Sequence, residues 1–331
     1  QIERLARDLS SKNSDMPRYL TATEHLSGLD DDALITLIRE TISSSMSGSY
    51  REVVFGHLLD VLSERDVEPA LGTLMDVVPM ETIITSQRAK NMLTNGMLNL
   101  SNKDGPRALA WFNTHLESFS AIQKQPVFQN DRLEDKLRIA LAKGLIFSDA
   151  GQAIEVLRPV PREQVVFEFQ MLANNNQVGA NKDASGYIRV VRELFPAEKA
   201  DEAVAEIVGG YFNGFPSVDG LLERYAFTPE ETAAIVIKAG SLHFSQASYQ
   251  AGKMGKAIPE YRKWLESRST ADIDQRIGAA LGKTVAGWPQ NSEPIYQAIL
   301  DSGKIGLGEQ AIISLLETAG SKLGMELSLI H

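Results

Sequence analysis

The residues that come closest to a known chemical motif read GAALGKTVAGW and span 278–288. Gly282-Lys283-Thr284 matches the end of a P-loop, in which backbone N–H groups and the lysine hold phosphate. The full motif, G-x-x-x-x-G-K-[ST], needs a glycine where this chain has Ile277, and it needs a strand before the loop. Apolar residues instead recur at helical spacing through this sequence, and the N–H groups of a helix interior are already bonded. The sequence therefore predicts a helix here, with no nucleotide and no other cofactor.

Histidine and aspartate residues supply no second motif for catalysis or metal binding. None of the histidines falls at metal-ligand spacing; they are His25, His57, His115, His243 and His331. The run Asp30-Asp31-Asp32 favours a helix N-terminus, where acidic side chains are stabilised, and no calcium-binding loop follows it. We therefore predict no catalytic, cofactor-binding or metal-binding residues, and the sequence does not identify binding residues.

The large aromatic side chains could line a ligand site or fill a core. They include Trp111, Trp264, Trp288 and the stretch 211-YFNGF-215. Aromatic residues at helical spacing are more often part of a core than a platform for a ligand, and we predict the core role here.

Composition limits the classes of partner. The chain has 331 residues, a formal net charge of −10, 43% hydrophobic residues, 23% charged residues and no cysteine. These values describe a folded chain with no broad basic face, which argues against nucleic acid as a partner. No apolar run approaches the roughly 18 residues of a membrane span, so no membrane insertion is expected. The first residue is Gln1, which fits removal of an export signal, and the compartment stays open between extracytoplasmic and cytoplasmic.

A repeat organises the chain. Polar residues suited to helix N-caps are each followed by apolar residues four and five positions later, and mostly by apolar residues again seven or eight positions later. These residues are Asp30, Asp66, Asp104, Asp149, Asp183, Ser217 and Asn291. Successive caps are 36, 38, 45, 34, 34 and 74 residues apart, and a divergent unit centred on 257–267 accounts for the last spacing. Periods of this length are typical of units made of two helices and two turns.

The second helix of each unit is also visible. Thr228, Pro229 and Glu231 form a capping box with proline at the first helical position, which opens a helix over 228–244. Equivalent helices are expected over 80–98, 131–147, 162–177, 197–213, 271–287 and 309–323, and an N-terminal helix is expected over 2–9. Glycines late in these helices, Gly282 among them, predict close approach of neighbouring helices.

This pattern resembles the α/α-solenoids of the tetratricopeptide-like group. The segment 104-DGPRALAWFNTHLES-118 is similar to helices of large bacterial helical-repeat proteins of unknown function. The resemblance implies a scaffold for protein–protein interaction, and it assigns no catalytic residue.

We therefore predict an all-α fold, a right-handed α/α superhelix of about eight helix-turn-helix repeats. A single helical-repeat domain is expected over 1–331, with an N-terminal cap at 1–29, repeats at 30–308 and a C-terminal capping helix at 309–331. The expected function is non-catalytic binding of a protein or peptide, or of a glycan, along a curved surface. Two alternatives stay open, an α/α-toroid enzyme that acts on polysaccharide through carboxylates and a structural protein that self-assembles.

Overall fold

The computed structural model describes residues 2–65, 67–125, 132–174, 183–249, 253–287, 293–301 and 307–323. These residues form helices joined by turns and short connections, and no strand occurs among them. The prediction of an all-α fold is therefore confirmed.

Two compact units divide the chain, Gln1–Pro161 and Arg162–His331, and each is described by itself. The organisation of 1–331 as a single repeat domain stays a prediction, as do the number of repeats and the hand of a superhelix.

The first unit contains ten described helices. They are α1 (Ile2–Leu9), α2 (Met16–Ser27), α3 (Asp31–Ser43), α4 (Gly48–Arg65), α5 (Val67–Val77), α6 (Met80–Thr85), α7 (Gln87–Lys103), α8 (Gly105–Gln123), α9 (Leu133–Leu145) and α10 (Ala150–Leu157).

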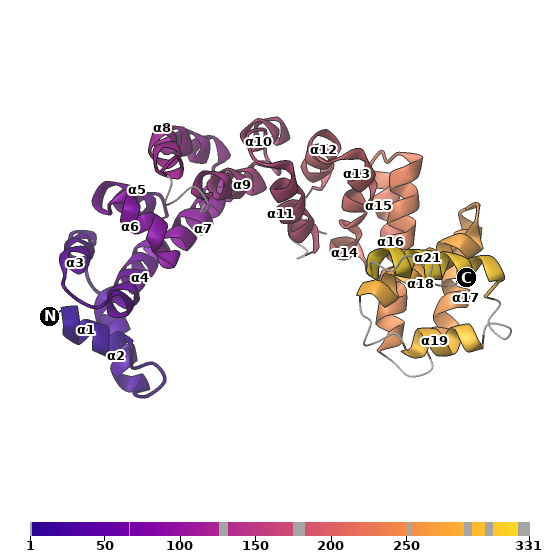
Figure 1. Ribbon diagram of the computed structural model, residues 1–331, viewed down its shortest axis with the longest axis horizontal. Helices are drawn as coiled ribbons and strands as arrows, with labels where there is room; N and C mark the ends of the chain where they lie inside the picture. Colours follow the sequence, from indigo (N-terminus) through magenta and orange to yellow (C-terminus); the bar gives the residue numbers. More distant parts are fainter. Residues whose placement is uncertain are drawn as a thin grey trace. The chain divides into compact units, whose positions relative to one another are not determined.

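Helices of the first unit pack in two rows. Helix α4 contacts α1 and α7, and α7 contacts α9. These four helices, α1, α4, α7 and α9, form the first row. Helices α3, α5, α8 and α10 lie along the other side of the unit (Figure 1), and each contacts a member of the first row. Helices of this unit thus pack on helices that are not adjacent in the sequence, as α4 does on α7 and α7 does on α9.

The second unit also consists of helices throughout its described part. They are α11 (Arg162–Asn174), α12 (Ser185–Leu194), α13 (Ala197–Ala205), α14 (Val208–Tyr211), α15 (Phe215–Arg224), α16 (Pro229–Ser248), α17 (Met254–Ser267), α18 (Ile273–Gly287), α19 (Glu293–Leu300) and α21 (Glu309–Leu323).

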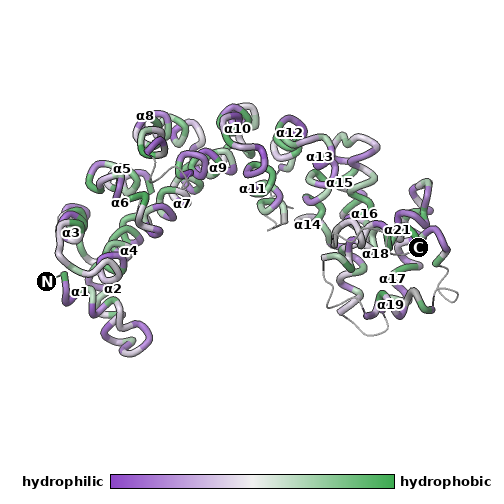
Figure 2. The backbone as a smooth tube through the Cα atoms, in the orientation of Figure 1, coloured by the Kyte–Doolittle hydropathy of each residue, from purple (hydrophilic) through white to green (hydrophobic). Residues whose placement is uncertain are grey.

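The same arrangement recurs in the second unit. Helix α16 contacts α13 and α18, and α18 contacts α21, while α15 and α17 pack against α16. Figure 2 shows that the helices of both units carry hydrophobic and hydrophilic residues together, as expected for helices with one buried side. The core is accordingly spread along each unit between successive helices.

Local capping signals explain several helix starts. Asp30, Asp104 and Asp149 each accept a hydrogen bond from the backbone N–H three residues on, at 2.8, 3.1 and 3.0 Å. The capping box of Thr228 and Glu231 is present at the start of α16. These predicted caps are confirmed, whereas Asp66 and Asn291 lie outside the described residues.

Two predicted caps are displaced. Ser217 lies inside α15, which begins at Phe215, because Pro216 suits a first turn and Gly214 enters the helix at a φ of +86°. Helix α12 begins after Ala184, and the preceding Asp183 accepts hydrogen bonds from the N–H and the hydroxyl of Ser185, at 3.2 and 2.9 Å.

Two predicted second helices are divided. The helix expected over 80–98 is broken at Ser86, whose Oγ accepts the N–H of Ala89 at 3.2 Å and so caps α7. The helix expected over 197–213 separates into α13 and α14, and glycines at 209 and 210 lower the helix propensity of the second piece. The helices predicted over 2–9 and 309–323 have the expected bounds.

Candidate functional site

The glycine-lysine-threonine stretch lies in the interior of α18, as predicted. Lys283 Nζ is 2.9 Å from the Glu202 carboxylate, and 16% of the lysine side chain is exposed. The buried Thr284 hydroxyl lies 2.8 Å from the carbonyl oxygen of Ala280 and 3.2 Å from that of Ser241. Both side chains therefore stabilise helix packing, while the expectation that no nucleotide binds here stays a prediction.

Glycines of the same helix allow close contact with α21. A Cβ at Gly282 would lie 2.7 Å from the carbonyl oxygen of Leu315 and 2.7 Å from Thr318 Cβ. A Cβ at Gly278 would overlap the carbonyl group of Ala311. The prediction that Gly282 serves close helix packing is confirmed.

The histidines and tryptophans of the described residues do not gather into one site. Trp111 and Trp264 are buried, which confirms their core role, and Trp288 lies outside the described residues. The His115 ring packs on Trp111 with ring centroids 4.3 Å apart. Among the residues that the structure describes, which exclude His331, no group of three or more His, Asp or Glu side chains could hold a metal ion.

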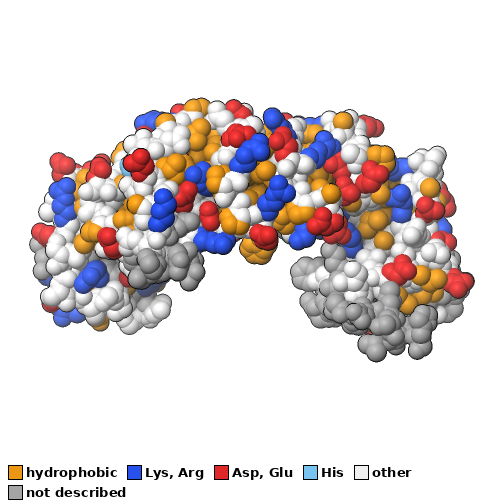
Figure 3. Space-filling view, turned by 45° about the horizontal axis from the view of Figure 1, so that its top comes forward, with side chains coloured by type: hydrophobic (Ala, Val, Ile, Leu, Met, Phe, Trp, Pro, Cys, Tyr) orange, Lys and Arg blue, Asp and Glu red, His pale blue; other side chains and the backbone are white. Residues whose placement is uncertain are grey.

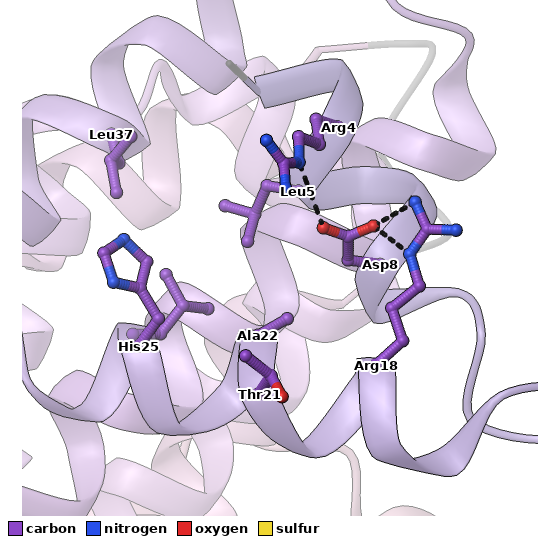
Figure 4. Close-up of a pocket in the computed structure, with 9 residues that line it drawn as sticks. Arg4, Leu5, Asp8, Arg18, Thr21, Ala22, His25 and Leu37 are labelled. Atoms are coloured by element: carbon purple, nitrogen blue, oxygen red, sulfur yellow. Dashed lines mark hydrogen bonds and ion pairs between the residues drawn. The ribbon is translucent and has the colours of Figure 1, made fainter.

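An open pocket of about 540 Å³ lies at the start of the chain, between α1, α2 and α3. Its apolar residues are Leu5 from α1, Ala22 and Leu26 from α2, and Leu37 from α3. Figure 4 shows Arg4, Asp8 and Arg18 gathered at one end, and His25 with Leu37 at the other.

Two arginines share one carboxylate in this pocket. Arg18 makes a close ion pair with Asp8, whose other oxygen lies 3.8 Å from Arg4 Nε. The side chains of Arg4 and Arg18 are 82% and 48% exposed, whereas that of Asp8 is 17% exposed. One carboxylate cannot use all N–H donors of two guanidinium groups, so donors stay available for an anion such as a carboxylate.

Short-range signals build the walls of this pocket. Asp15 caps α2 by accepting the N–H of Arg18 at 3.2 Å, and Pro17 occupies the first turn. Arg4 and Asp8 are four residues apart, so they share a face of α1. That spacing is visible in the sequence, but Arg18 joins them only when α2 packs on α1, so sequence reasoning missed the site.

Several shifted pKa values lie away from this pocket. Burial lowers the pKa of His57, and the nearby Arg88 lowers it further. Burial raises the pKa of Asp135 in α9. Burial also lowers the pKa of His243, whose Nε2 is 3.4 Å from the Glu260 carboxylate. These groups lie on different helices and do not form a common site.

The distribution of charge on the drawn surface does not indicate the charge of a partner. On the face drawn in Figure 3, Lys and Arg side chains are interspersed with Asp and Glu over both units. None of the described helices has the length and apolar character needed to cross a bilayer.

Comparison with known proteins gives one distant similarity. The kinesin heavy chain of Neurospora crassa is 24% identical over 189 residues, which is 56% of this chain and 19% of the kinesin chain. The matched region therefore spans about a fifth of that relative's length. No protein-family model matches the chain. No solved structure matches it either.

Proposed function

We propose that the chain is a non-catalytic helical-repeat scaffold of the tetratricopeptide-like kind that binds a protein or peptide. The observation that carries the proposal is the sequence separation of the side-chain contacts that join its helices. The similarity to the kinesin heavy chain assigns no activity to this chain, because it covers 19% of that relative.

Polar contacts link residues about one predicted period apart. In the first unit these contacts join Asp31 to Arg65, Glu52 to Ser86, Glu68 to Arg107, and Ser101 to the carbonyl oxygen of Leu141. In the second unit they join Arg192 to Glu231, Glu206 to Lys238, and Ser241 to Thr284. These separations run from 32 to 43 residues, close to the cap spacings of 34 to 45.

Such spacing is expected when each hairpin stacks on the next. In a repeat protein, a unit contacts its neighbours and buries its apolar face against them. The ion pair of Lys283 with Glu202, 81 residues away, spans about two periods. The charged and hydroxyl side chains in these contacts therefore stabilise the packing of one hairpin on the next, which favours a structural role for them over a catalytic one.

The N-terminal pocket suits recognition of an anionic group. Its guanidinium groups, from Arg4 and Arg18, favour a carboxylate, and its apolar wall favours an adjacent apolar side chain. The Thr21 hydroxyl in the lining donates to the Pro17 carbonyl oxygen at 2.9 Å, so it is held by its own helix. The geometry supports binding better than covalent catalysis.

Affinity capture with the intact chain, followed by calorimetry with each purified partner, tests the proposal. We expect saturable binding of a polypeptide and no release of sugar from a panel of polysaccharides. Saccharide release without polypeptide binding would instead support the toroid enzyme. Scattering in solution adds a second test, because an open solenoid should exceed the radius of gyration of roughly 20 Å for a compact chain of this length.

A further inference from the structure

A second open depression, of about 440 Å³, lies in the first unit beside α7. Its walls come from α4, α5 and α7, and α7 contributes three asparagines to its lining. These are Asn91, Asn95 and Asn99, all exposed and four residues apart. Residues at this spacing lie on one side of a helix, so the three amides form a row along the depression.

The amides in this row have hydrogen-bonding groups available. Asn95 and Asn99 make no side-chain hydrogen bond to any other residue that the structure describes. Gln87 donates to Asn91 Oδ1 at 2.8 Å, which leaves the N–H donors of Asn91 free to bind. Each amide side chain combines a donor and an acceptor, the same pair that a peptide backbone presents.

We propose that this row of amides binds the backbone of an extended polypeptide segment laid along α7. The inference rests on the proposed scaffold function and specifies the conformation of what one surface binds. Four residues of α-helix advance about 6.0 Å, while two residues of an extended strand advance about 6.6–6.8 Å. The three asparagines therefore keep nearly in step with every second residue of an extended chain.

Partly exposed apolar residues of the lining suit side chains of such a segment. Val67 and Met92 provide these apolar contacts, while Leu71 is buried beneath them. Gly96 lets the side chain of Leu71 lie against α7, because a Cβ at this glycine would be 2.8 Å from Leu71 Cδ2. Alternate side chains of an extended peptide point in opposite directions, so one set would face this apolar surface and the other would face solvent.

The dependence of binding on ionic strength distinguishes this surface from the N-terminal pocket. Hydrogen bonds between neutral amides and a peptide backbone are insensitive to salt, whereas contacts to exposed arginines weaken as salt screens them. Arg88 and Asp60 also line the depression, and they pair with each other at 3.8 Å. Binding through the amides along α7 should therefore persist in high salt and should be unaffected by Arg4→Gln.

The test begins with a phage-displayed library of random linear peptides panned against the intact chain. Selected peptides are synthesised with a fluorophore, and their affinities are measured by fluorescence anisotropy. We expect Asn95→Ala and Asn99→Ala each to weaken binding by about threefold to tenfold, as for loss of one or two hydrogen bonds. Asn102→Ala is the matched control, since Asn102 is exposed on the same helix and does not line the depression.

Backbone N-methylation of the peptide gives a second readout. Methyl groups on alternate residues should abolish binding in one register and leave it unchanged in the other. Equal affinity for the wild type and the Asn95→Ala/Asn99→Ala variant would overturn the inference and leave the scaffold function standing. Failure to select any peptide would also overturn it, and the scaffold function would then rest on the capture experiment.

Discussion

Replacing Gly282 with alanine tests the close packing of α18 on α21. A Cβ at this position would meet the Leu315 carbonyl oxygen and Thr318 Cβ, both at 2.7 Å, and Ala319 N at 3.1 Å. Two of these three atoms belong to the backbone, so a change of rotamer cannot move them away. The substitution must therefore separate the helices or distort one of them.

The magnitude follows from two opposing terms. Overpacking a tight site costs about 1–3 kcal/mol, and contact with backbone atoms places Gly282→Ala near the upper end, about 3 kcal/mol. Alanine recovers about 1 kcal/mol through its higher helix propensity. We expect the free energy of unfolding to fall by about 2 kcal/mol, with the loss arising from the contact with α21.

Gly220→Ala provides the matched control in the same unit. Gly220 is exposed in the middle of α15, and a Cβ there would meet nothing within 4 Å. This variant should be more stable than the wild type by about 0.5–1 kcal/mol, from helix propensity alone. Urea unfolding followed by circular dichroism measures both changes, and a stabilised or unchanged Gly282→Ala variant would refute the packing argument.

Three further predictions concern buried polar groups. Arg192→Met should lower the free energy of unfolding by about 2 kcal/mol, below the ~3–5 kcal/mol of a fully buried pair, because the Arg192 side chain is 41% exposed although Glu231 is 3% exposed. Urea unfolding measures this loss. Burial lowers the pKa of His243, so the unfolded state takes up a proton more readily; stability should be full above about pH 6.5 and fall as pH decreases through the folded-state pKa. Histidine NMR titration should show this lowered pKa, and Glu260→Gln should lower it further by removing the opposing negative charge. Ser101→Ala should cost about 1 kcal/mol in urea unfolding, since its buried hydroxyl donates to the Leu141 carbonyl oxygen at 2.6 Å.

Controls decide the interpretation of these variants. Arg189→Met removes an exposed pair with Glu193 and should change stability by no more than about 1 kcal/mol. An equal loss in Arg189→Met and Arg192→Met would contradict the role of the buried carboxylate. A His243 pKa above its ordinary value would show that the carboxylate outweighs burial.

Helix positions could be predicted from sequence where the signal is local. The box of Thr228 and Glu231 is complete within four residues, and it forms as read. The helix starts near Ser86 and Ser217 differ from the prediction, because the sequence allows more than one position for a helix to begin in each region. Ser86 can cap a new helix inside an apolar pattern, and Pro216 can open a helix before the serine.

The candidate surfaces could be predicted less well. The spacing of Asn91, Asn95 and Asn99 is legible in the sequence, and it places them on one side of any helix there. Whether that side faces a neighbour, solvent or a depression depends on how α4 and α5 pack against α7. The pocket of Arg4 and Arg18 likewise needs the contact between α1 and α2, which no local pattern specifies.

Helix α7 shows why stability and binding should separate in this protein. Buried residues of this helix, among them Leu93, Gly96 and Leu100, pack against neighbouring helices, while Asn95 and Asn99 are exposed. Both sets recur at helical spacing, so one helix carries a packing face and a presenting face on different sides. Asn95→Ala and Asn99→Ala should therefore weaken binding without lowering the free energy of unfolding, because alanine has the higher helix propensity. Gly96→Ala should act first on stability, because its Cβ would meet the side chain of Leu71. A loss of stability in the asparagine variants equal to that in Gly96→Ala would mean that the amides hold the hairpins together and are not free to bind a peptide.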